Sequence, residues 1–361
     1  METRTGLYSI RGETPSGALA GFASALREAL GRAGVAEADD DDAHEASLVL
    51  NVVDAQAPKP FRRRSRGTFV AGLYERDADP TLESEYPMLV RALANIVLCH
   101  VPGRGVWFTT MERGFYHEDH RGDDAELADR VVERLLPIAR ARLVIDNEFR
   151  PDLEPDLWDG DDVTAEIGEA GVRLGALDLL PNPFPIEDLL SERELRHVKR
   201  LYGIGGLSYG NLSQRKDSTR FWMSASGVDK TKLEAPGRDI LLVSGYDEAN
   251  AKIILSVPPG IEPRRVSVDA IEHWMIYTQH PDVGAILHVH AWVEGIAATD
   301  INYPCGSEEL ARSVSELVDA APDPTKAIVG LRNHGITATG TSLTEILDRI
   351  ESKVMRQVPM F

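Results

Sequence analysis

The chain has 361 residues, of which 58 are acidic and 39 basic, so its formal net charge is −19. This length favours two domains that each bury a core of their own, and a content of 43% hydrophobic and 27% charged residues argues against wholesale disorder. Phosphate binding needs a surplus of Lys and Arg, so the charge balance argues against a general nucleic-acid or anionic-membrane binder. The basic run at residues 62–66 is interpreted as a solvated loop.

The cysteine content and the apolar segments bear on the compartment. Cys99 and Cys305 are too few for a disulfide framework and lack the spacing of a zinc-ligand pair, which predicts a cytoplasmic protein. The N-terminus has no apolar signal region, and the longest apolar stretch, residues 88–101, is interrupted by Arg91 and Asn95. We therefore expect neither secretion nor membrane insertion.

The first 150 residues alternate between strand-like and helix-like patterns. Apolar runs predict strands at 7–10, 47–53, 67–74, 105–110 and 141–146, and helical spacing predicts helices over 18–30, 86–99 and 124–140. This alternation predicts an open α/β domain over residues 1–150. No motif gives that domain a role: Gly103-Arg-Gly105 lacks the third glycine of a dinucleotide fingerprint, and His117 and His120 are interpreted as surface-loop residues.

Residues 151–187 are acidic and contain several prolines, a composition typical of a connection between domains. A new helix is predicted from Ser191, which can cap it while Glu194 completes a capping box. We therefore expect a second α/β domain over residues 188–361.

Two small-residue turns follow that helix. Residues 205–215 place glycines around Ser208 and Asn211, and residues 224–228 contain Ser226 and Gly227 between predicted strands at 220–223 and 239–243. Glycine lets the backbone approach an anion, and Ser and Asn side chains add donors, so these turns suit a phosphate or carboxylate. Each is also typical of an ordinary turn.

A helix, a turn and a strand over residues 267–290 indicate half of a metal site. Ser267 is predicted to cap the helix, and the strand ends in His288-Val-His290, whose imidazoles point to the same face and can share one divalent ion. A third candidate, His334, lies 44 positions beyond His290, after the apolar run at 327–331. Asp269 in the first helical turn either complements the helix dipole or serves as a carboxylate near the histidines.

Taken in order, the motifs Gly-Leu-Ser-Tyr-Gly-Asn-Leu-Ser, Ser-Ala-Ser-Gly, Ser-Val-Asp, Gly-Ala-Ile-Leu-His-Val-His and Arg-Asn-His-Gly resemble the class II aldolase/adducin family over about residues 188–361. The resemblance implies a central β-sheet flanked by helices, a divalent metal, usually zinc, and a cyclic homotetramer with active sites between subunits. Carried over by motif, it implies metal ligands at His288, His290 and His334, phosphate binding by Ser208, Asn211, Ser226, Gly227 and Ser267, and a catalytic Asp269.

Three features depart from the family pattern. Asp269 stands where the fuculose-phosphate aldolases have glutamate and the ribulose-phosphate 4-epimerases have aspartate. Ser267-Val268 replaces the Ser-Ser pair of many members, so one phosphate donor is absent. The chain ends 27 residues after His334, without a clear counterpart of the tail that carries a catalytic tyrosine. Tyr303 is either a substitute proton donor or part of a structural turn.

The leading functional hypothesis is a divalent-metal-dependent lyase of the class II aldolase type. A cation bound by three neutral imidazoles can chelate a small hydroxy-ketone or sugar-phosphate-like substrate and stabilise the enediolate through which a carbon–carbon bond is cleaved or formed. Asp269 then acts either as acid/base or as fourth ligand. The alternatives are a non-catalytic module like the adducin head domain and a metal-dependent sugar-phosphate epimerase or decarboxylase.

Overall fold

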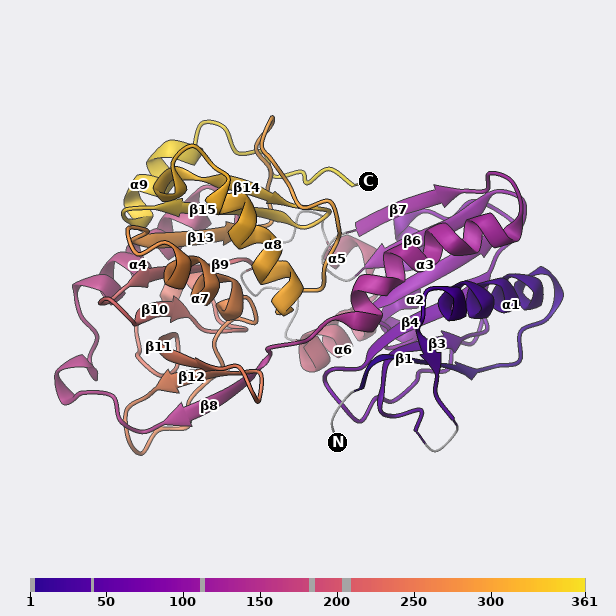
Figure 1. The fold of residues 1–361 in the computed structure, drawn as a ribbon, viewed down its shortest axis with the longest axis horizontal. Helices are drawn as coiled ribbons and strands as arrows, with labels where there is room; N and C mark the ends of the chain where they lie inside the picture. Colours follow the sequence, from indigo (N-terminus) through magenta and orange to yellow (C-terminus); the bar gives the residue numbers. More distant parts are fainter. Residues whose placement is uncertain (1–3, 40–41, 111–113, 182–185, 203–208, 361) are drawn as a thin grey trace. The chain divides into compact units, whose positions relative to one another are not determined.

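The computed structural model describes residues 4–39, 42–110, 114–181, 186–202 and 209–360, and the chain divides into two compact units (Figure 1). The first unit contains the described residues up to Ala141, the short segment that carries α5 (Ile186–Leu189) and α6 (Glu192–Tyr202), and Met360. The second unit begins at Arg142 and contains the remaining described residues up to Pro359.

The first unit is built on a seven-stranded sheet of order β2-β1-β3-β4-β5-β6-β7, whose strands from β2 to β5 are parallel and whose last two are antiparallel. Helices α1 (Gly17–Arg32) and α3 (Asp124–Arg140) share one core with alternate residues of the strands. The α/β class predicted for this half is confirmed. The strands are β1 (Arg4–Gly12), β2 (Ala36–Glu37), β3 (Ala46–Val52), β4 (Phe69–Glu75), β5 (Ile96–Val101), β6 (Gly105–Thr110) and β7 (Gly114–Asp119).

The helix predicted over residues 86–99 is wrong in its second half. Helix α2 (Leu82–Arg91) ends there, and Leu93 takes a left-handed φ of 52°, which a continuing helix does not allow. The Asn95 side chain then accepts a hydrogen bond from the Val70 amide at 2.9 Å, and the chain continues as strand β5. A continuous apolar run is compatible with a buried strand and with a buried helix, so the sequence did not show that the helix ends before residue 99.

The second unit contains an eight-stranded sheet of order β14-β15-β13-β9-β10-β11-β12-β8, antiparallel except where β12 pairs with β8. Its strands are β8 (Asp146–Arg150), β9 (Asn211–Arg215), β10 (Phe221–Ser224), β11 (Ile240–Asp247), β12 (Lys252–Ser256), β13 (Ala285–Val289), β14 (Ile328–Leu331) and β15 (Gly335–Gly340). Short 3₁₀ turns lie at η1 (Pro155–Leu157), η2 (Lys230–Lys232) and η3 (Pro324–Lys326).

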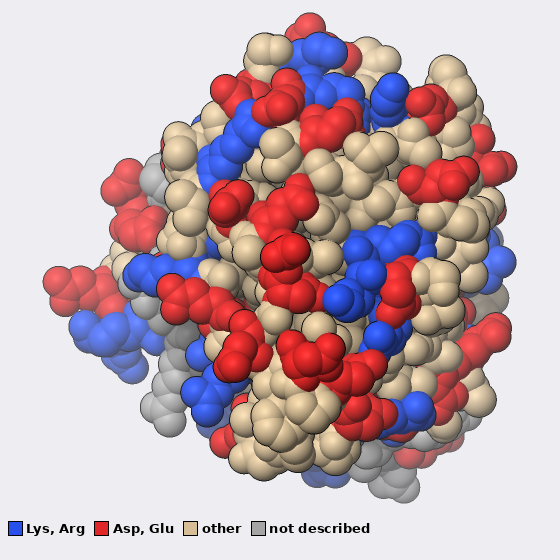
Figure 2. Space-filling model, turned by 90° about the vertical axis from the view of Figure 1, so that its left-hand side faces the viewer, with Lys and Arg blue, Asp and Glu red and all other residues tan. Residues whose placement is uncertain are grey.

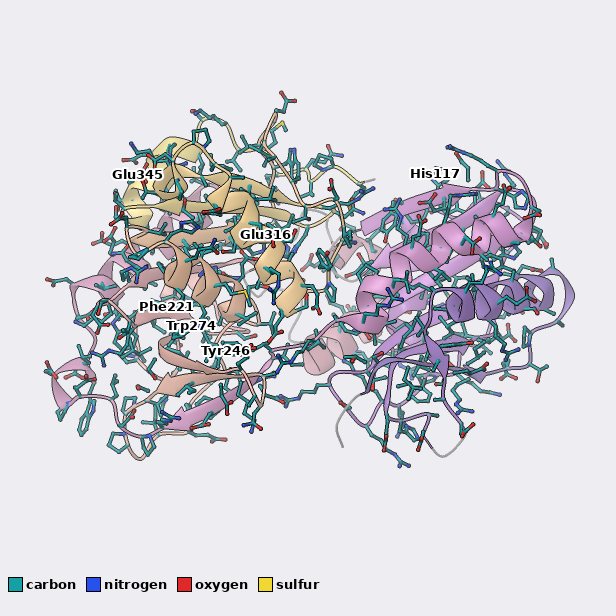
Figure 3. All side chains as sticks on the ribbon, viewed as in Figure 1. His117, Phe221, Tyr246, Trp274, Glu316 and Glu345 are labelled. Carbon is teal, nitrogen blue, oxygen red and sulfur yellow. The ribbon has the colours of Figure 1, made fainter. Side chains whose placement is uncertain are left out.

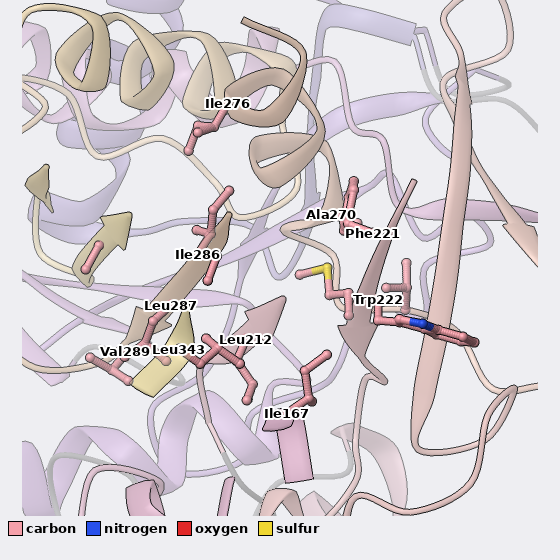
Figure 4. Packing of buried hydrophobic residues seen from close by; sticks show 14 of the residues in the cluster. Ile167, Leu212, Phe221, Trp222, Ala270, Ile276, Ile286, Leu287, Val289 and Leu343 are labelled. Carbon is pink, nitrogen blue, oxygen red and sulfur yellow. The ribbon is translucent and has the colours of Figure 1, made fainter. Parts of the chain in front are cut away.

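Helices cover both faces of this sheet, which matches the expected central sheet flanked by helices. Ile276 of α7 (Ala270–Gln279) lies on the side of Ile286, whereas Leu343 of α9 (Leu343–Ile350) lies with Leu287 on the other (Figure 4). Because alternate residues of β13 face opposite sides, both faces of this strand are buried. Helix α8 (Glu308–Asp319) packs beside α7, and α4 (Asp162–Ala176) packs beside α9.

Aromatic side chains fix α7 on the sheet. Phe221 of β10 lies with its ring centroid 4.7 Å from that of Tyr277 and 6.5 Å from that of Trp274, both on α7 (Figure 3). Such tilted aromatic pairs add to the stabilisation that area burial alone gives. The N-terminal end of α7 is held over β9 by a different contact, the hydrogen bond from the Asn211 amide to the carboxylate of the N-cap residue Asp269.

The structure places the unit boundaries differently from the expected 150 and 188. Residues 146–150 form β8 at the edge of the second sheet, and residues 151–187 are not a bare connection, because they include η1 and the whole of α4. Ile167 and Leu174 of α4 are buried in the second core. The acidic composition concealed this helix, whose apolar positions are spaced one or two turns apart.

Charged side chains of both signs lie together on the surface. On the face drawn in Figure 2, Lys and Arg lie among Asp and Glu and form no broad basic patch. Among the helices that the structure describes, none is both long and apolar enough to cross a membrane.

Candidate metal centre

Three histidines converge at one end of strand β13. His288 lies on β13, His290 directly follows it, and His334 lies in the turn between β14 and β15. Because β15 pairs antiparallel with β13, that turn is brought beside the end of β13. The structure therefore brings together the three residues that the sequence predicted as metal ligands.

The geometry of the three imidazoles fits a shared divalent ion. One ligand atom from each lies within 4.8 Å of the others, and all three residues are buried. The Nε2 atoms of His290 and His334 are 3.1 Å apart, and the rings meet edge to face. Neutral imidazole nitrogens at such separations form the donor set that zinc prefers.

A backbone carbonyl orients His288. Its Nδ1 lies 3.0 Å from the carbonyl oxygen of Ile336 on β15. A carbonyl oxygen only accepts hydrogen bonds, so Nδ1 carries the proton and the lone pair is on Nε2. Metal-binding histidines are typically oriented by such a bond from the second ring nitrogen.

The residues around His334 explain why this turn has the sequence Asn-His-Gly. Asn333 has a φ of 56°, a left-handed conformation that asparagine tolerates better than most residues. A Cβ added to Gly335 would lie 2.2 Å from the carbonyl oxygen of Val289, so only glycine lets β15 approach β13 this closely. Both features place the imidazole of His334 against that of His290.

A row of polar side chains crosses the sheet next to the histidines. Asn211 of β9 and Thr337 of β15 are the register partners of His288 on either side. The Asn211 amide donates to Asp269 Oδ2 at 2.7 Å, and the Thr337 hydroxyl donates to Glu272 Oε1 at 2.5 Å. Two carboxylates, those of the N-cap residue Asp269 and of Glu272 in the first turn of α7, thus lie over the face that carries His288.

Asp269 lies beside the metal candidates but outside their group. It is the N-cap residue of α7 and is buried, with its carboxylate turned to Asn211 rather than to a helix amide. The predicted cap at Ser267 is wrong: the Ser267 amide pairs with the Ser224 carbonyl at the end of β10, so the helix begins later, at Ala270. Among the described residues, these three histidines are the one group of three or more possible ligands whose atoms all lie close to one another, within 4.8 Å, and Asp269 is not part of it.

Glu272 is a buried carboxyl that the sequence did not single out. Burial and, after it, the charge of Asp269 raise the pKa of Glu272 well above its usual range, while the hydrogen bond from Thr337 acts in the opposite sense. His273, one residue further, is a buried neutral imidazole, since burial lowers its pKa to about 3. Its Nδ1 lies 2.7 Å from the Ser213 hydroxyl, as expected of a histidine that packs rather than binds metal.

Lys230 is a second residue that sequence reasoning missed. It lies on η2 with a relative exposure of 2%, and burial lowers its pKa to about 8 against the opposing charges of Asp269 and Asp229. Helix α4 covers it, because Gly171 approaches the Lys230 carbonyl so closely that a Cβ would lie 1.9 Å away. A lysine after a Ser-Gly turn carries no motif of its own, so only its burial and its electrostatic interaction with Asp269 reveal it.

The predicted anion-binding residues are partly brought together. Ala225 and Val266 form an isolated bridge, so Ser226 and Ser267 lie on adjoining segments next to it. Gly227 has a φ of 70° and open space where a Cβ would lie. Ser208 lies outside the described residues. Asn211 is bound to Asp269, so its side chain orients the carboxylate.

Comparison with known proteins gives a family for part of this unit. A sequence profile described as Class II Aldolase and Adducin N-terminal domain matches residues 195–300. The C-terminal half of the chain therefore contains a class II aldolase/adducin domain. His288 and His290 lie within the matched segment, whereas His334 lies beyond the C-terminal end of that segment.

Curated relatives match part of the chain. Methylthioribulose-1-phosphate dehydratase of Leptospira biflexa serovar Patoc is 34% identical over 137 residues, which are 37% of this chain and 61% of the relative. The protein of the same name from Yersinia enterocolitica is 33% identical over 125 residues, or 35% of this chain and 49% of the relative. The chain thus spans about three fifths of the Leptospira relative and about half of the Yersinia one.

Solved structures with some likeness to this chain include an L-fuculose 1-phosphate aldolase, which is 19% identical to it with a TM-score of 0.36. The match covers 54% of this chain and 83% of that chain. An aldolase II superfamily protein from Pseudomonas syringae is 17% identical with a TM-score of 0.36 and covers 56% and 73%.

Proposed function

We propose that the class II aldolase/adducin domain binds one divalent metal ion, most simply Zn²⁺, through His288, His290 and His334, and that it is a metal-dependent lyase. The observation that carries this proposal is the convergence of three buried imidazoles, with Nε2 atoms of His290 and His334 3.1 Å apart and Nδ1 of His288 bound to a carbonyl.

A divalent ion held by neutral imidazoles supplies an undiminished positive charge that polarises a carbonyl and stabilises an adjacent enediolate. The chain supplies the proton transfer. Asp269 is held by the Asn211 amide beside His288 and lies outside the group of mutually close ligand atoms, which favours acid/base work over metal ligation. Lys230 adds a positive charge near Asp269 that favours its ionised form.

The substrate that we propose is a small hydroxy-ketone or sugar-phosphate-like molecule. Its anionic end would lie against Ser226, Gly227 and Ser267, whose segments adjoin at the bridge between Ala225 and Val266. Ser208 belongs to the same proposed subsite. A homotetramer and a cytoplasmic location, both expected from the sequence, are part of this proposal.

Two reactions pass through an enediolate next to a carbonyl. The first is cleavage or formation of a carbon–carbon bond, which the sequence pattern predicted. The second is loss of water, which is favoured by the relatives named methylthioribulose-1-phosphate dehydratase. Loss of water and formation of a carbon–carbon bond begin with removal of a C–H proton next to that carbonyl, whereas cleavage begins with removal of the proton of the hydroxyl beyond the bond that breaks. In both, Asp269 moves the proton and the imidazoles hold the cation.

The test is metal content followed by a substrate panel. We expect the purified protein, supplied with Zn²⁺ and then desalted, to retain about one ion per chain, and His290→Ala to retain less than about a tenth of that. His117→Ala is the matched control, because His117 is an exposed histidine on β7 of the first unit. A wild-type protein that retains no divalent metal would refute the proposal.

The panel then separates the reactions. Metal-loaded protein is incubated with ketose phosphates, or with donor ketones and aldehydes, and the products are followed by NMR. Aldehyde release indicates carbon–carbon cleavage, whereas a dehydrated diketone product indicates loss of water. Turnover that survives in His290→Ala, or a metal-loaded protein that is inert on every substrate class, would count against a lyase and favour the interaction module.

A further inference from the structure

The ring of Tyr209 lies against the imidazole of His290, one of the three histidines of the proposed metal centre. The two ring centroids are 5.4 Å apart, and the ring planes are inclined by 44°. Tyr209 is half-buried, whereas His290 is only 8% exposed. Aromatic rings attract one another at such separations, so the phenol ring both contacts and covers a metal-binding side chain.

The register of β9 and β13 explains why these two side chains meet. Asn211, the first residue of β9, is the partner of His288, so the antiparallel register continued by two residues sets Tyr209 against His290. Opposite side chains of an antiparallel pair lie on the same face of a sheet. The Tyr209 ring therefore lies on the face that also carries the His288 imidazole and the Asn211 amide.

The backbone around Tyr209 is fixed against β13. Gly210 has a φ of 70°, and a Cβ there would lie 2.4 Å from the His288 carbonyl oxygen, so only glycine lets the chain pass this closely. The Tyr209 amide donates to the carbonyl of Leu180, a buried core residue, at 2.8 Å. These two contacts fix the side from which the ring reaches His290.

Each of the three imidazoles touches a different group outside the cluster. His288 donates to a backbone carbonyl, and His334 packs against the thiol of Cys305. His290 meets the Tyr209 ring. A metal-bound imidazole loses electron density to the cation, so its attraction to an electron-rich phenol ring increases when the ion binds. An interaction that is stronger in the metal-bound state raises the affinity for the metal.

We propose that Tyr209 is a positioning residue of the metal centre, whose ring holds the His290 imidazole in place for the ion and slows the release of that ion. This inference rests on the proposed metal site. It assigns the effect to the aromatic ring rather than to the hydroxyl, because the ring makes the contact. Groups that orient a metal ligand typically change the metal affinity by about 10- to 100-fold.

Zinc release tests the role of Tyr209 without any activity assay. The zinc-loaded protein is mixed with an excess of a chromogenic chelator, and the transfer of zinc gives the dissociation rate. We expect Tyr209→Ala to release zinc about tenfold faster than the wild type, and Tyr209→Phe, which keeps the ring, to stay within about twofold of it. Tyr246→Ala is the matched control and should release zinc at the wild-type rate, since Tyr246 is a partly buried tyrosine on β11, three strands from β13 (Figure 3).

Cobalt adds a readout that a general loss of stability does not move. Tetrahedral Co²⁺ absorbs strongly in the visible, and this absorption weakens when a protein ligand is lost and water raises the coordination number. We expect weaker visible absorption per bound ion in Tyr209→Ala, because His290 is no longer held in place. Tyr209→Phe and Tyr246→Ala should keep the wild-type spectrum.

The outcomes separate this inference from the metal site itself. Release from Tyr209→Ala at the wild-type rate, or an equal acceleration in Tyr209→Phe or Tyr246→Ala, overturns the role of the ring and leaves the three-histidine site standing. A wild-type protein that binds no divalent ion overturns both. If Tyr209→Ala does not fold, Tyr209→Leu decides, because it keeps an apolar side chain without the ring: faster release than from Tyr209→Phe is expected, and release at the wild-type rate refutes the aromatic contact.

Discussion

The ammonium group of Lys230 illustrates how the chemistry of single residues depends on contacts that are remote in sequence. Lys230 and Asp269 are 39 positions apart, yet the carboxylate acts on the pKa of the lysine. The three metal candidates were predictable, because alternation along one strand and an Asn-His-Gly turn are local patterns. Lys230 and Glu272 were not, since nothing in their own neighbourhoods marks them. The roles of Asp269 and of the anion-binding residues stay predictions.

Lys230 makes stability depend on pH above neutrality. Its pKa is about 8 in the folded protein against 10.5 as the ordinary value, so the unfolded chain binds more protons between these two values. Stability from this group is therefore fully present above pH 10.5 and is lost as the pH falls through 8.

The measurement is the free energy of unfolding in urea at pH 8 and pH 10. We expect the wild-type value, relative to that of Lys230→Met, to rise by about 2 kcal/mol between these pH values. The subtraction removes the titration of tyrosines and other lysines that both proteins share. Parallel pH curves for the two proteins would show that Lys230 is solvated rather than buried.

At the scale of elements, helix α4 shows where pattern reading succeeded and where it failed. The strands at 105–110 and the helix at 124–140 were predicted with the bounds that the structure has, because their apolar periods are unbroken. Residues 162–176 were assigned to a connection because acidic residues and nearby prolines dominated the composition. The buried face of α4 is narrow. It consists of Ile167, Ala170 and Leu174, together with Gly171 where the helix meets η2.

A glycine-to-alanine substitution is expected to lower stability where α4 meets η2 and to raise it on the exposed face of α1. Gly171→Ala places a Cβ about where the Lys230 carbonyl lies, so we expect a loss of about 1–3 kcal/mol from overpacking. Gly21→Ala, in the exposed middle of α1 with open space around it, should raise stability by up to about 1 kcal/mol. Thermal and urea unfolding of both variants provide the comparison, and a Gly171→Ala protein as stable as the wild type would mean that α4 does not pack so closely.

At the scale of the whole molecule, the segment that matches the family does not coincide with the second unit, since its first residues lie in α6 of the first unit. The profile of the class II aldolase/adducin family matches residues 195–300, yet the sheet of this unit takes β8 from residues 146–150 and its core takes α4. The sequence suggested a boundary at 188 because the recognisable motifs begin after it. Edge strands and covering helices carry no motif, so their membership follows only from pairing and burial.

This organisation predicts which fragments of the chain fold. A fragment of residues 142–361 keeps β8 and α4, whereas one of residues 188–361 leaves β12 as an unpaired edge and exposes the apolar side chains that α4 covers. We expect cooperative unfolding and a single species in size-exclusion chromatography for the longer fragment, and aggregation for the shorter. A monodisperse, cooperatively unfolding 188–361 fragment would contradict this assignment.

The turn that carries His334 has a consequence for the kinetics of folding. The complete set of imidazoles exists only after β15 has paired with β13, and the two histidines that this pairing unites are 44 residues apart, with α8 between them. Contacts that form after the rate-limiting barrier change the unfolding rate rather than the folding rate. A metal ion that binds only after this pairing would therefore lower the unfolding rate of the domain and leave its folding rate unchanged.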